Sequence, residues 1–277
     1  MNTLPVALQV YGIRDILEQN PEKFSEVMAQ VKAIGYDGVE LAGLYGLDPV
    51  FVRETLQRIG LVPVGAHVPL DELMDDIEKI IAVYKLIGTR YLVVPYLPEK
   101  YRPQNPGYEK AISELTRIGN LVADHDMTLL YHNHDFEFVV LPDKTFGLDD
   151  IYARVPPRAL EAELDTCWIK VAEQDPAAYL GKYQGRCPVV HLKDYIKEGR
   201  PKNLYQLIGI DREAAGEDSG IFEFRSVGFG QQIWEPILTA ALEADAKWAV
   251  VEQDEHYGLP SLECARRSRA YLRILGW

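Results

Sequence analysis

Short β-branched runs alternate with longer helical patterns along almost the whole chain, and this alternation constrains the fold more than any other feature. Apolar residues recur with the period of a strand in the short runs and with the period of a helix in the longer segments. The predicted strands are Val6–Tyr11, Gly38–Ala42, Val62–Val68, Tyr91–Tyr96, Thr128–His134, Leu160–Asp165, Val189–Asp194 and Trp248–Asp254. The predicted helices are Pro21–Ile34, Pro49–Ile59, Leu70–Leu86, Pro106–Ala123, Leu148–Val155, Pro176–Tyr183, Ile233–Glu243 and Ser261–Leu275. Strand–helix units in such a series predict a parallel sheet with helical crossovers.

A sheet built from this many units closes naturally, so we predict an α/β fold, a single (β/α)8 TIM barrel domain that spans residues 1–277. The predicted helix ends agree with this fold, because three helices end in Ile-Gly at Gly35, Gly60 and Gly88, where glycine can adopt the left-handed cap conformation. A doubly wound open sheet is the alternative, but the turn after the first strand, GIRDILEQN, lacks the glycine-rich phosphate fingerprint. The long irregular stretch Ile196–Gly230 follows the seventh strand, where active-site loops of a barrel belong.

The composition excludes several classes of partner. A net charge of −13 would repel a polyanion, so we expect no nucleic-acid partner. The start, MNTLPVALQV, shows no secretion signal, and no stretch of about 18 apolar residues occurs, so we expect no membrane partner. The cysteines Cys167, Cys187 and Cys264 form no CxxC pair and favour a reducing, cytoplasmic location.

Most of the histidines gather at predicted strand ends, where catalytic groups of a barrel lie. These are His67, His132, His134 and His191, with His256 shortly after the eighth strand; His125 lies elsewhere. A single histidine is more often a structural group than a ligand. Five histidines at one face of the barrel favour a functional site.

Carboxylates fall in the same places. Asp165 ends the sixth strand, Glu252 lies late in the eighth, and Glu137 follows the fifth. A carboxylate at the end of a buried strand is costly unless it is paired or bound to a metal. Oxygen and imidazole ligands without thiolate suit Mn²⁺, Mg²⁺, Co²⁺ or Zn²⁺, and we expect one such divalent cation. The alternative is that these carboxylates form ion pairs with Lys193 or Arg186.

Strand alternation indicates which of these side chains point inward. His191 is in phase with Val189 and Lys193, and Glu252 is in phase with Val250, so both can face the barrel interior. In the sixth strand the same rule puts three acids, Glu161, Glu163 and Asp165, on one face. Either a bulge breaks the phase there or one of these acids is paired.

Two further motifs have competing interpretations. His132 and His134 form an HxH that could belong to a binuclear hydrolase, but barrel amidohydrolases carry it on the first strand, which here offers Gln9 and Tyr11. Gly228-Phe229-Gly230 precedes a helix where many barrels bind phosphate. The net negative neighbourhood of this GxG favours a tight turn that needs flexible backbone.

With these residues assembled, the chain resembles the xylose isomerase-like barrel family, which includes sugar isomerases and epimerases, inosose dehydratases and endonuclease IV. The likeness extends from GYDGVELAG through YHNHDFEF, ELDTCW and VVHLKDY to VGFG and VVEQDE. Family members typically bind one divalent metal, and the resemblance implies the ligands Glu137, Asp165, His191 and Glu252. In sugar epimerases the first of these glutamates lies within the strand, a place that His132 occupies here, so His132 is the alternative ligand.

The resemblance implies a metal-dependent isomerase or epimerase that acts on a sugar-like polyol, with Mn²⁺ the expected cation. The implied catalytic residues are Glu137 and Glu252 as acid and base, with Lys193 orienting a hydroxyl. The implied substrate-binding residues are His67, His132, His134 and Trp168, the last as an apolar wall. Dehydration of a keto-polyol and non-catalytic sugar binding are the alternatives, and a monomer and a homo-oligomer both remain open.

Overall fold

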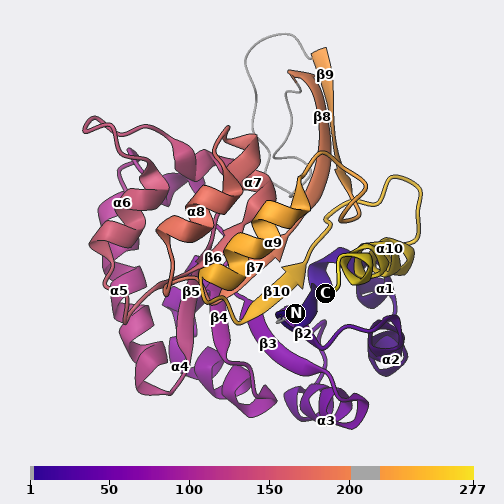
Figure 1. Cartoon of the computed structure of the whole chain (residues 1–277). Helices are drawn as coiled ribbons and strands as arrows, with labels where there is room; N and C mark the ends of the chain where they lie inside the picture. Colours follow the sequence, from indigo (N-terminus) through magenta and orange to yellow (C-terminus); the bar gives the residue numbers. More distant parts are fainter. Residues whose placement is uncertain (1–2, 201–218) are drawn as a thin grey trace.

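The computed structural model describes residues 3–200 and 219–277, and its central feature is the predicted closed parallel barrel (Figure 1). The strands follow one another around the barrel in the order β1-β10-β7-β6-β5-β4-β3-β2, and each neighbouring pair is parallel. Their bounds are β1 Val6–Gln9, β2 Gly38–Ala42, β3 Val62–His67, β4 Tyr91–Val94, β5 Thr128–His132, β6 Glu161–Asp165, β7 Val189–Leu192 and β10 Trp248–Val251. The predicted (β/α)8 fold is therefore confirmed. Several strands end two or three residues earlier than predicted, so that Lys193 and Glu252 lie just beyond them.

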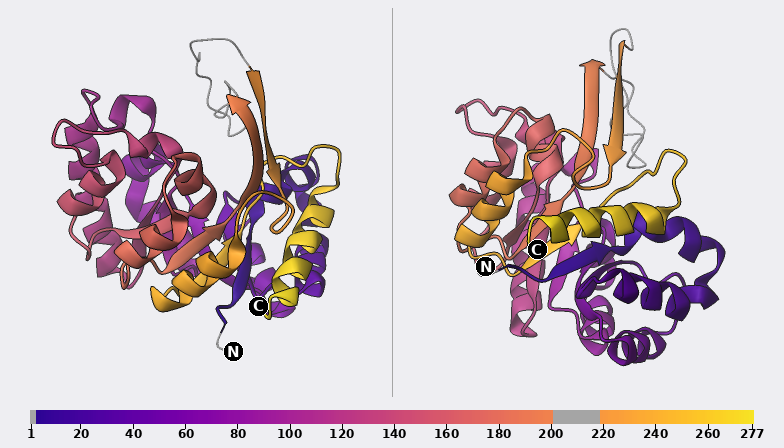
Figure 2. Two further views of the ribbon diagram at one scale, coloured as in Figure 1. Left: turned by 45° about the horizontal axis from the view of Figure 1, so that its top comes forward. Right: turned by 45° about the vertical axis from the view of Figure 1, so that its right-hand side comes forward.

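The helices surround this barrel (Figure 2). Every predicted helix is present: α2 Phe24–Ile34, α3 Pro49–Ile59, α4 Leu70–Ile87, α5 Tyr108–Asp124, α6 Gly147–Arg154, α8 Pro176–Lys182, α9 Trp234–Glu243 and α10 Ser261–Ile274. Two short helices that the sequence did not predict, α1 Arg14–Gln19 and α7 Thr166–Val171, follow β1 and β6. Among the described residues, no helix has the length and apolar character needed to cross a membrane.

Glycine caps end three of the helices as predicted. Gly35, Gly60 and Gly88 have φ angles of 104°, 79° and 98°, in the left-handed region that favours glycine. The backbone N–H of each donates to carbonyl groups of the last helical turn. These caps satisfy carbonyls that the helix itself leaves without partners, and they turn the chain toward the next strand.

The base of the barrel interior is apolar. Inward-facing side chains from alternate strand positions form a buried layer of Ala7, Val64, Tyr91, Val93, Leu130, Val189 and Val250. The half-buried Trp248 packs against this layer. Such a layer fills the lower part of the barrel, so polar side chains further along the same strands rest on closely packed side chains.

The prediction of an irregular loop over Ile196–Gly230, after β7, is partly wrong. Residues Asp194–Arg200 form β8 and Ser219–Arg225 form β9, an antiparallel pair that projects beyond the barrel in every view, while residues 201–218 lie outside the described part (Figures 1 and 2). Asp194 ties the base of this hairpin, because Oδ2 of its carboxylate accepts hydrogen bonds from the backbone N–H groups of Gly228 and Gly230 and from the Trp234 ring. Gly228 has a φ of 87°, in agreement with the predicted tight turn.

Candidate active site and metal centre

Four side chains from four strands meet at the carboxyl end of the barrel. They are His132 from the end of β5, Asp165 from the end of β6, His191 from β7 and Glu252 directly after β10. All four are buried, and each offers one ligand atom within 4.8 Å of the others. His132 Nε2 lies 3.5 Å from Asp165 Oδ2, and His191 Nδ1 lies 3.0 Å from Glu252 Oε2. We call these four residues the upper cluster.

The upper cluster has the donors and the spacing of a divalent-cation site. Imidazole and carboxylate atoms that bind one cation at about 2.0–2.2 Å must lie close together, and the four ligand atoms here all lie within 4.8 Å of one another. Asp165 Oδ2 is buried and accepts no hydrogen bond from the described residues. A buried carboxylate oxygen without a hydrogen-bond donor is costly, and a cation would satisfy it. The residues present therefore fit a divalent cation.

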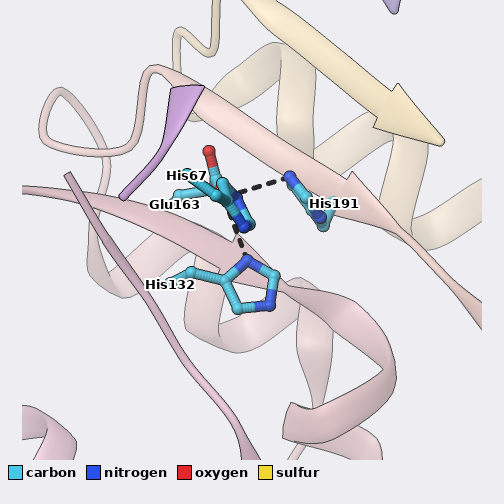
Figure 3. A group of neighbouring side chains, drawn as sticks. All are labelled: His67, His132, Glu163 and His191. Carbon is cyan, nitrogen blue, oxygen red and sulfur yellow. Dashed lines mark hydrogen bonds and ion pairs between the residues drawn. The ribbon is translucent and has the colours of Figure 1, made fainter. Parts of the chain in front are cut away.

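A second group lies directly beneath the upper cluster and shares two histidines with it. Glu163, two residues before Asp165 on β6, is within 3.0 Å of the rings of His67, His132 and His191 (Figure 3). Glu40 from β2 adds a second carboxylate, with Oε2 at 2.8 Å from His191 Nε2. The register of β6 with β5 and β7 shows no shift, so the three acids of this strand keep their phase and the pairing alternative holds.

Lys193 neutralises part of this charge. Its buried ammonium lies 2.8 Å from Asp254 and 3.0 Å from Glu252, and it also faces Asp165 at 3.7 Å. Burial lowers the pKa of the Lys193 amine, but the carboxylates of Asp254, Glu252 and Asp165 outweigh it and raise that pKa well above its ordinary value. Lys193 therefore carries a fixed positive charge beside the upper cluster.

Burial and neighbouring charges both shift the pKa values of these groups, and the two effects often oppose each other. Burial raises the pKa of Asp165 to about 7, although Lys193 opposes the shift. Burial alone would lower the pKa of His67, but Glu40 and Glu163 outweigh it and raise this pKa to about 10. Burial lowers the pKa of His132 to about 4. Perturbed groups that gather at the end of a barrel are typical of a functional site.

A cavity of about 650 Å³ opens onto these groups. His67, His132, His134, Lys193 and Glu252 line its polar end. Its other walls come from the ends of β2 and β4 and from α4, and include Ala42, Val68, Pro69, Glu72, Ile80, Val83, Tyr84 and Tyr96. A cavity of this size and mixed lining is typical of a small-molecule site.

The structure does not bring Glu137 to the upper cluster. Its buried carboxylate accepts hydrogen bonds from the Tyr131 hydroxyl at 2.6 Å and from the backbone N–H of His134 at 2.7 Å. Glu137 belongs neither to a potential metal-binding group of the described residues nor to the cavity wall. The strand position before it, occupied by His132, supplies the nitrogen that faces Asp165 instead.

The other predicted site residues divide between the cavity and its surroundings. The His134 ring lines the cavity and contacts Trp168 at a centroid distance of 5.1 Å. Trp168 lies behind it, fully buried, and packs against Phe222 and Phe224 of the β8–β9 hairpin. His256 lies against a separate, much smaller pocket.

Sequence reasoning missed Glu40 and assigned no role to Asp254, which is in phase with Glu252, or to Glu163. Glu40 stands within GYDGVELAG on β2, and alternation along this strand could have placed it inward. Gln9 on β1 donates to Glu40 Oε2 at 2.8 Å and so fixes it among the histidines.

Comparisons with known proteins agree with this arrangement of strands. An inosose dehydratase of Clostridium botulinum (strain Alaska E43 / Type E3) is 22% identical over 276 residues, which cover 90% of this chain and 89% of that protein. A sugar phosphate isomerase/epimerase structure from Parabacteroides distasonis superposes with a TM-score of 0.77 at 19% identity, covering 99% of this chain and 94% of the other. The structure of the probable 3-DHS dehydratase involved in petrobactin synthesis from Bacillus anthracis gives a TM-score of 0.75 at 15% identity, with coverage of 98% and 99%. At such identities the structural likeness shows the shared fold.

The fold and the cluster at its strand ends define a (β/α)8 barrel of the kind that places its chemistry at the carboxyl ends of the strands. The family model for xylose isomerase-like TIM barrels matches residues 28–275, and the chain belongs to that family. The resemblance inferred from the sequence motifs is thus confirmed.

Proposed function

We propose that this protein is a divalent-metal-dependent enzyme that isomerises or epimerises a sugar-like polyol by moving a proton on a carbon next to a carbonyl. One observation carries the proposal: His132 and Glu252 of the upper cluster, together with Lys193, line a cavity that is large enough for such a substrate. Excess buried negative charge beside a cavity is costly in a purely structural role, and it suits a cation-dependent reaction.

The cation would be held by His132 Nε2, Asp165 Oδ2, His191 Nδ1 and Glu252 Oε2. His132 replaces Glu137 in the ligand set, because the Glu137 carboxylate is occupied by Tyr131 and by the backbone of His134. Mixed oxygen and imidazole donors without thiolate suit Mn²⁺, Mg²⁺, Co²⁺ or Zn²⁺, and Mn²⁺ is the cation that we would test first. A bound cation would supply a Lewis acid that polarises a substrate carbonyl.

The chain's own residues would handle the proton and the charge. Glu252 lines the cavity, and its carboxylate is the base that would accept the proton from carbon. The Lys193 ammonium, 3.0 Å from Glu252, would donate a hydrogen bond to the oxygen on which negative charge develops. His67 and His134 lie along the same wall and would orient hydroxyl groups, while His132, also predicted to bind substrate, would hold the cation instead. Trp168 acts indirectly, by holding the His134 ring from behind.

Dehydration of a keto-polyol is the second candidate, and the relatives favour it. The 22% identical relative is named an inosose dehydratase, and one structural neighbour is named a probable 3-DHS dehydratase. In this reaction Glu252 would accept the proton from the carbon next to the carbonyl, and the bond to the β-hydroxyl would break. The proton taken up by Glu252 would pass to the departing hydroxyl, which leaves as water, and the Lys193 ammonium would donate a hydrogen bond to that oxygen.

Solvent exchange with mass analysis separates these reactions. The protein, loaded with Mn²⁺, would be incubated in D2O with a panel of keto-sugars and inososes. Isomerisation or epimerisation places deuterium on the carbon next to the carbonyl without loss of water, so the mass rises by one unit for each deuterium, whereas dehydration removes one water. Both should stop when a chelator removes the metal. Substrate binding without deuterium uptake or conversion would contradict the proposal and leave a sugar-binding barrel.

A further inference from the structure

Glu163 lies at the centre of three imidazole rings, which makes it unusual among the acids of the barrel. Its Oε1 is 2.8 Å from His67 Nε2, 2.9 Å from His132 Nδ1 and 3.0 Å from His191 Nε2 (Figure 3). Glu163 and His191 are fully buried, and His132 is almost so. The carboxylate is not among the groups that line the cavity, so it lies beneath the reacting groups and not beside a substrate.

His132 and His191 contact both Glu163 and the upper cluster, and each uses one ring nitrogen for Glu163 and the other for the cluster. His132 faces Glu163 through Nδ1 and Asp165 through Nε2. His191 faces Glu163 through Nε2 and Glu252 through Nδ1. One nitrogen of each ring is therefore directed down to Glu163, and the other is directed up to the proposed cation.

A neutral imidazole carries one N–H, so this geometry fixes where each proton must be. A ring nitrogen that binds a cation uses its lone pair, and the N–H is then on the other nitrogen. Building on the proposed function, we infer that Glu163 is a positioning residue that sets opposite tautomers in two metal ligands. In the metal-loaded protein His132 is protonated at Nδ1 and donates to Glu163, and His191 is protonated at Nε2, where its N–H is shared between Glu40 at 2.8 Å and Glu163 at 3.0 Å.

The surroundings of Glu163 hold its carboxylate in place for this role. His67 Nε2 lies 3.2 Å from Glu40 as well as 2.8 Å from Glu163, and so links the two carboxylates. Glu40 also lies 2.8 Å from His191 Nε2 and accepts from Gln9. Carboxylates that accept from metal-binding histidines orient the rings and raise their basicity, and their loss typically lowers metal affinity about 10–100-fold.

The same geometry defines the competing arrangement. A cation bound within His67, His132, Glu163 and His191 would use His132 Nδ1 and His191 Nε2 as ligands. The ring protons would then be on the opposite nitrogens. Both arrangements cannot be occupied at once by neutral histidines, so the tautomers report which set of atoms binds the metal.

The first test is metal affinity in Glu163→Gln, compared with Glu161→Gln on the same strand. Glu161 is half-buried and two residues below Glu163, so its variant makes the same charge change outside the histidine group. Titration with Mn²⁺ should give a dissociation constant about 10–100-fold higher for Glu163→Gln and little changed for Glu161→Gln. Equal affinity of Glu163→Gln and the wild type would overturn the inference.

The second test needs no variant and therefore does not depend on whether Glu163→Gln folds. Long-range ¹⁵N–¹H spectra of the Zn²⁺-loaded protein, labelled at histidine, report the protonated nitrogen of each ring. Protonation of His132 at Nδ1 and of His191 at Nε2 supports the inference, and the reverse pattern overturns it in favour of a cation beside Glu163. Wild-type protein that binds no metal at neutral pH would overturn the metal site itself. If the tautomers are as expected but no substrate takes up deuterium, the inference about Glu163 stands and only the proposed reaction is contradicted.

Discussion

The two ends of the barrel interior are built by the same strands and have opposite character. At the base, Val189 and Val250 belong to a dry apolar layer, while two residues further along the same strands stand His191 and Glu252. Because successive inward positions on a strand are two residues apart, this change takes less than 7 Å of chain. The base excludes water and fixes the strands, and the top can therefore hold buried charges in a defined geometry. The comparison separates residues that maintain the fold from residues that we propose to carry the chemistry.

Replacing a group at the top should have the largest effect on turnover. Glu252→Gln keeps the shape of the side chain but removes a metal ligand and the proposed base, so we expect kcat to fall by about 10²–10⁴ with an unchanged circular dichroism spectrum. Glu78→Gln, at an exposed position of α4 outside the cavity wall, is the matched control and should retain activity. Full activity in Glu252→Gln, or an unfolded variant, would contradict the functional assignment of the top.

A truncation in the apolar layer at the base should lower the stability of the fold and leave the site in place. Leu130→Ala removes a fully buried side chain from the apolar layer, and we expect the free energy of unfolding to fall by about 2–5 kcal/mol. Urea denaturation of the metal-free protein measures this change. Leu86→Ala, at a 42% exposed position, should cost much less. The comparison of the two ends breaks down if Leu130→Ala abolishes metal binding in the molecules that remain folded.

Acidification should weaken metal binding at the top. In the metal-free protein burial raises the pKa of Asp165 to about 7, and Glu163 and Glu40 outweigh burial to raise the pKa of His191 well above its ordinary value. Both groups therefore hold protons near neutral pH that a cation must displace. We expect affinity to fall about tenfold per displaced proton for each unit of pH lowered below neutrality. Calorimetry in two buffers of different ionisation enthalpy counts the protons released, and a pH-independent affinity would exclude this coupling.

Glu137 sharpens the comparison because it is a buried acid outside the cluster. Burial raises its pKa to about 8 from an ordinary value of 4.5. A raised folded-state pKa means that its contribution to stability is full below about pH 4.5 and is lost as pH rises through 8. Glu137→Gln should therefore flatten the loss of unfolding free energy between these pH values, by at most about 1.4 kcal/mol per pH unit. Thermal unfolding of both proteins from pH 5 to 8 tests this, and parallel curves would show that Glu137 is ionised throughout.

The barrel could be predicted from the sequence because its signals are local. Alternation within β7 and β10 and the glycines at Gly35, Gly60 and Gly88 act within a few residues, and each produced the expected element. The short helix α7 was missed, since Asp165 caps it from the end of a strand and its six residues are too few for a periodic pattern.

The composition of the site could be predicted only in part, because partners are chosen by the closure of the barrel. Asp165, His191 and Glu252 were expected together, and the structure brings them together. The pairing of Glu163 with three histidines joins β6 to β3, β5 and β7, and nothing within one strand indicates it. The choice between His132 and Glu137 likewise depended on where the chain turns after β5, because that turn directs the Glu137 carboxylate to the backbone of His134.

The Asp194 carboxylate has a consequence for how this chain can change over evolution. By binding Gly228, Gly230 and Trp234, it joins the point where the chain leaves the barrel to the point where it returns. Gly230 approaches so closely that a Cβ would stand 2.2 Å from Asp194 Oδ1, so a larger residue would force this closure open. Insertions or deletions between these two points need not move Lys193, which directly precedes Asp194. Phe222 and Phe224 pack on Trp168 and must stay, so the replaceable module is the part of the projecting hairpin beyond them, in which new binding surface could be gained or lost while the site stays in register.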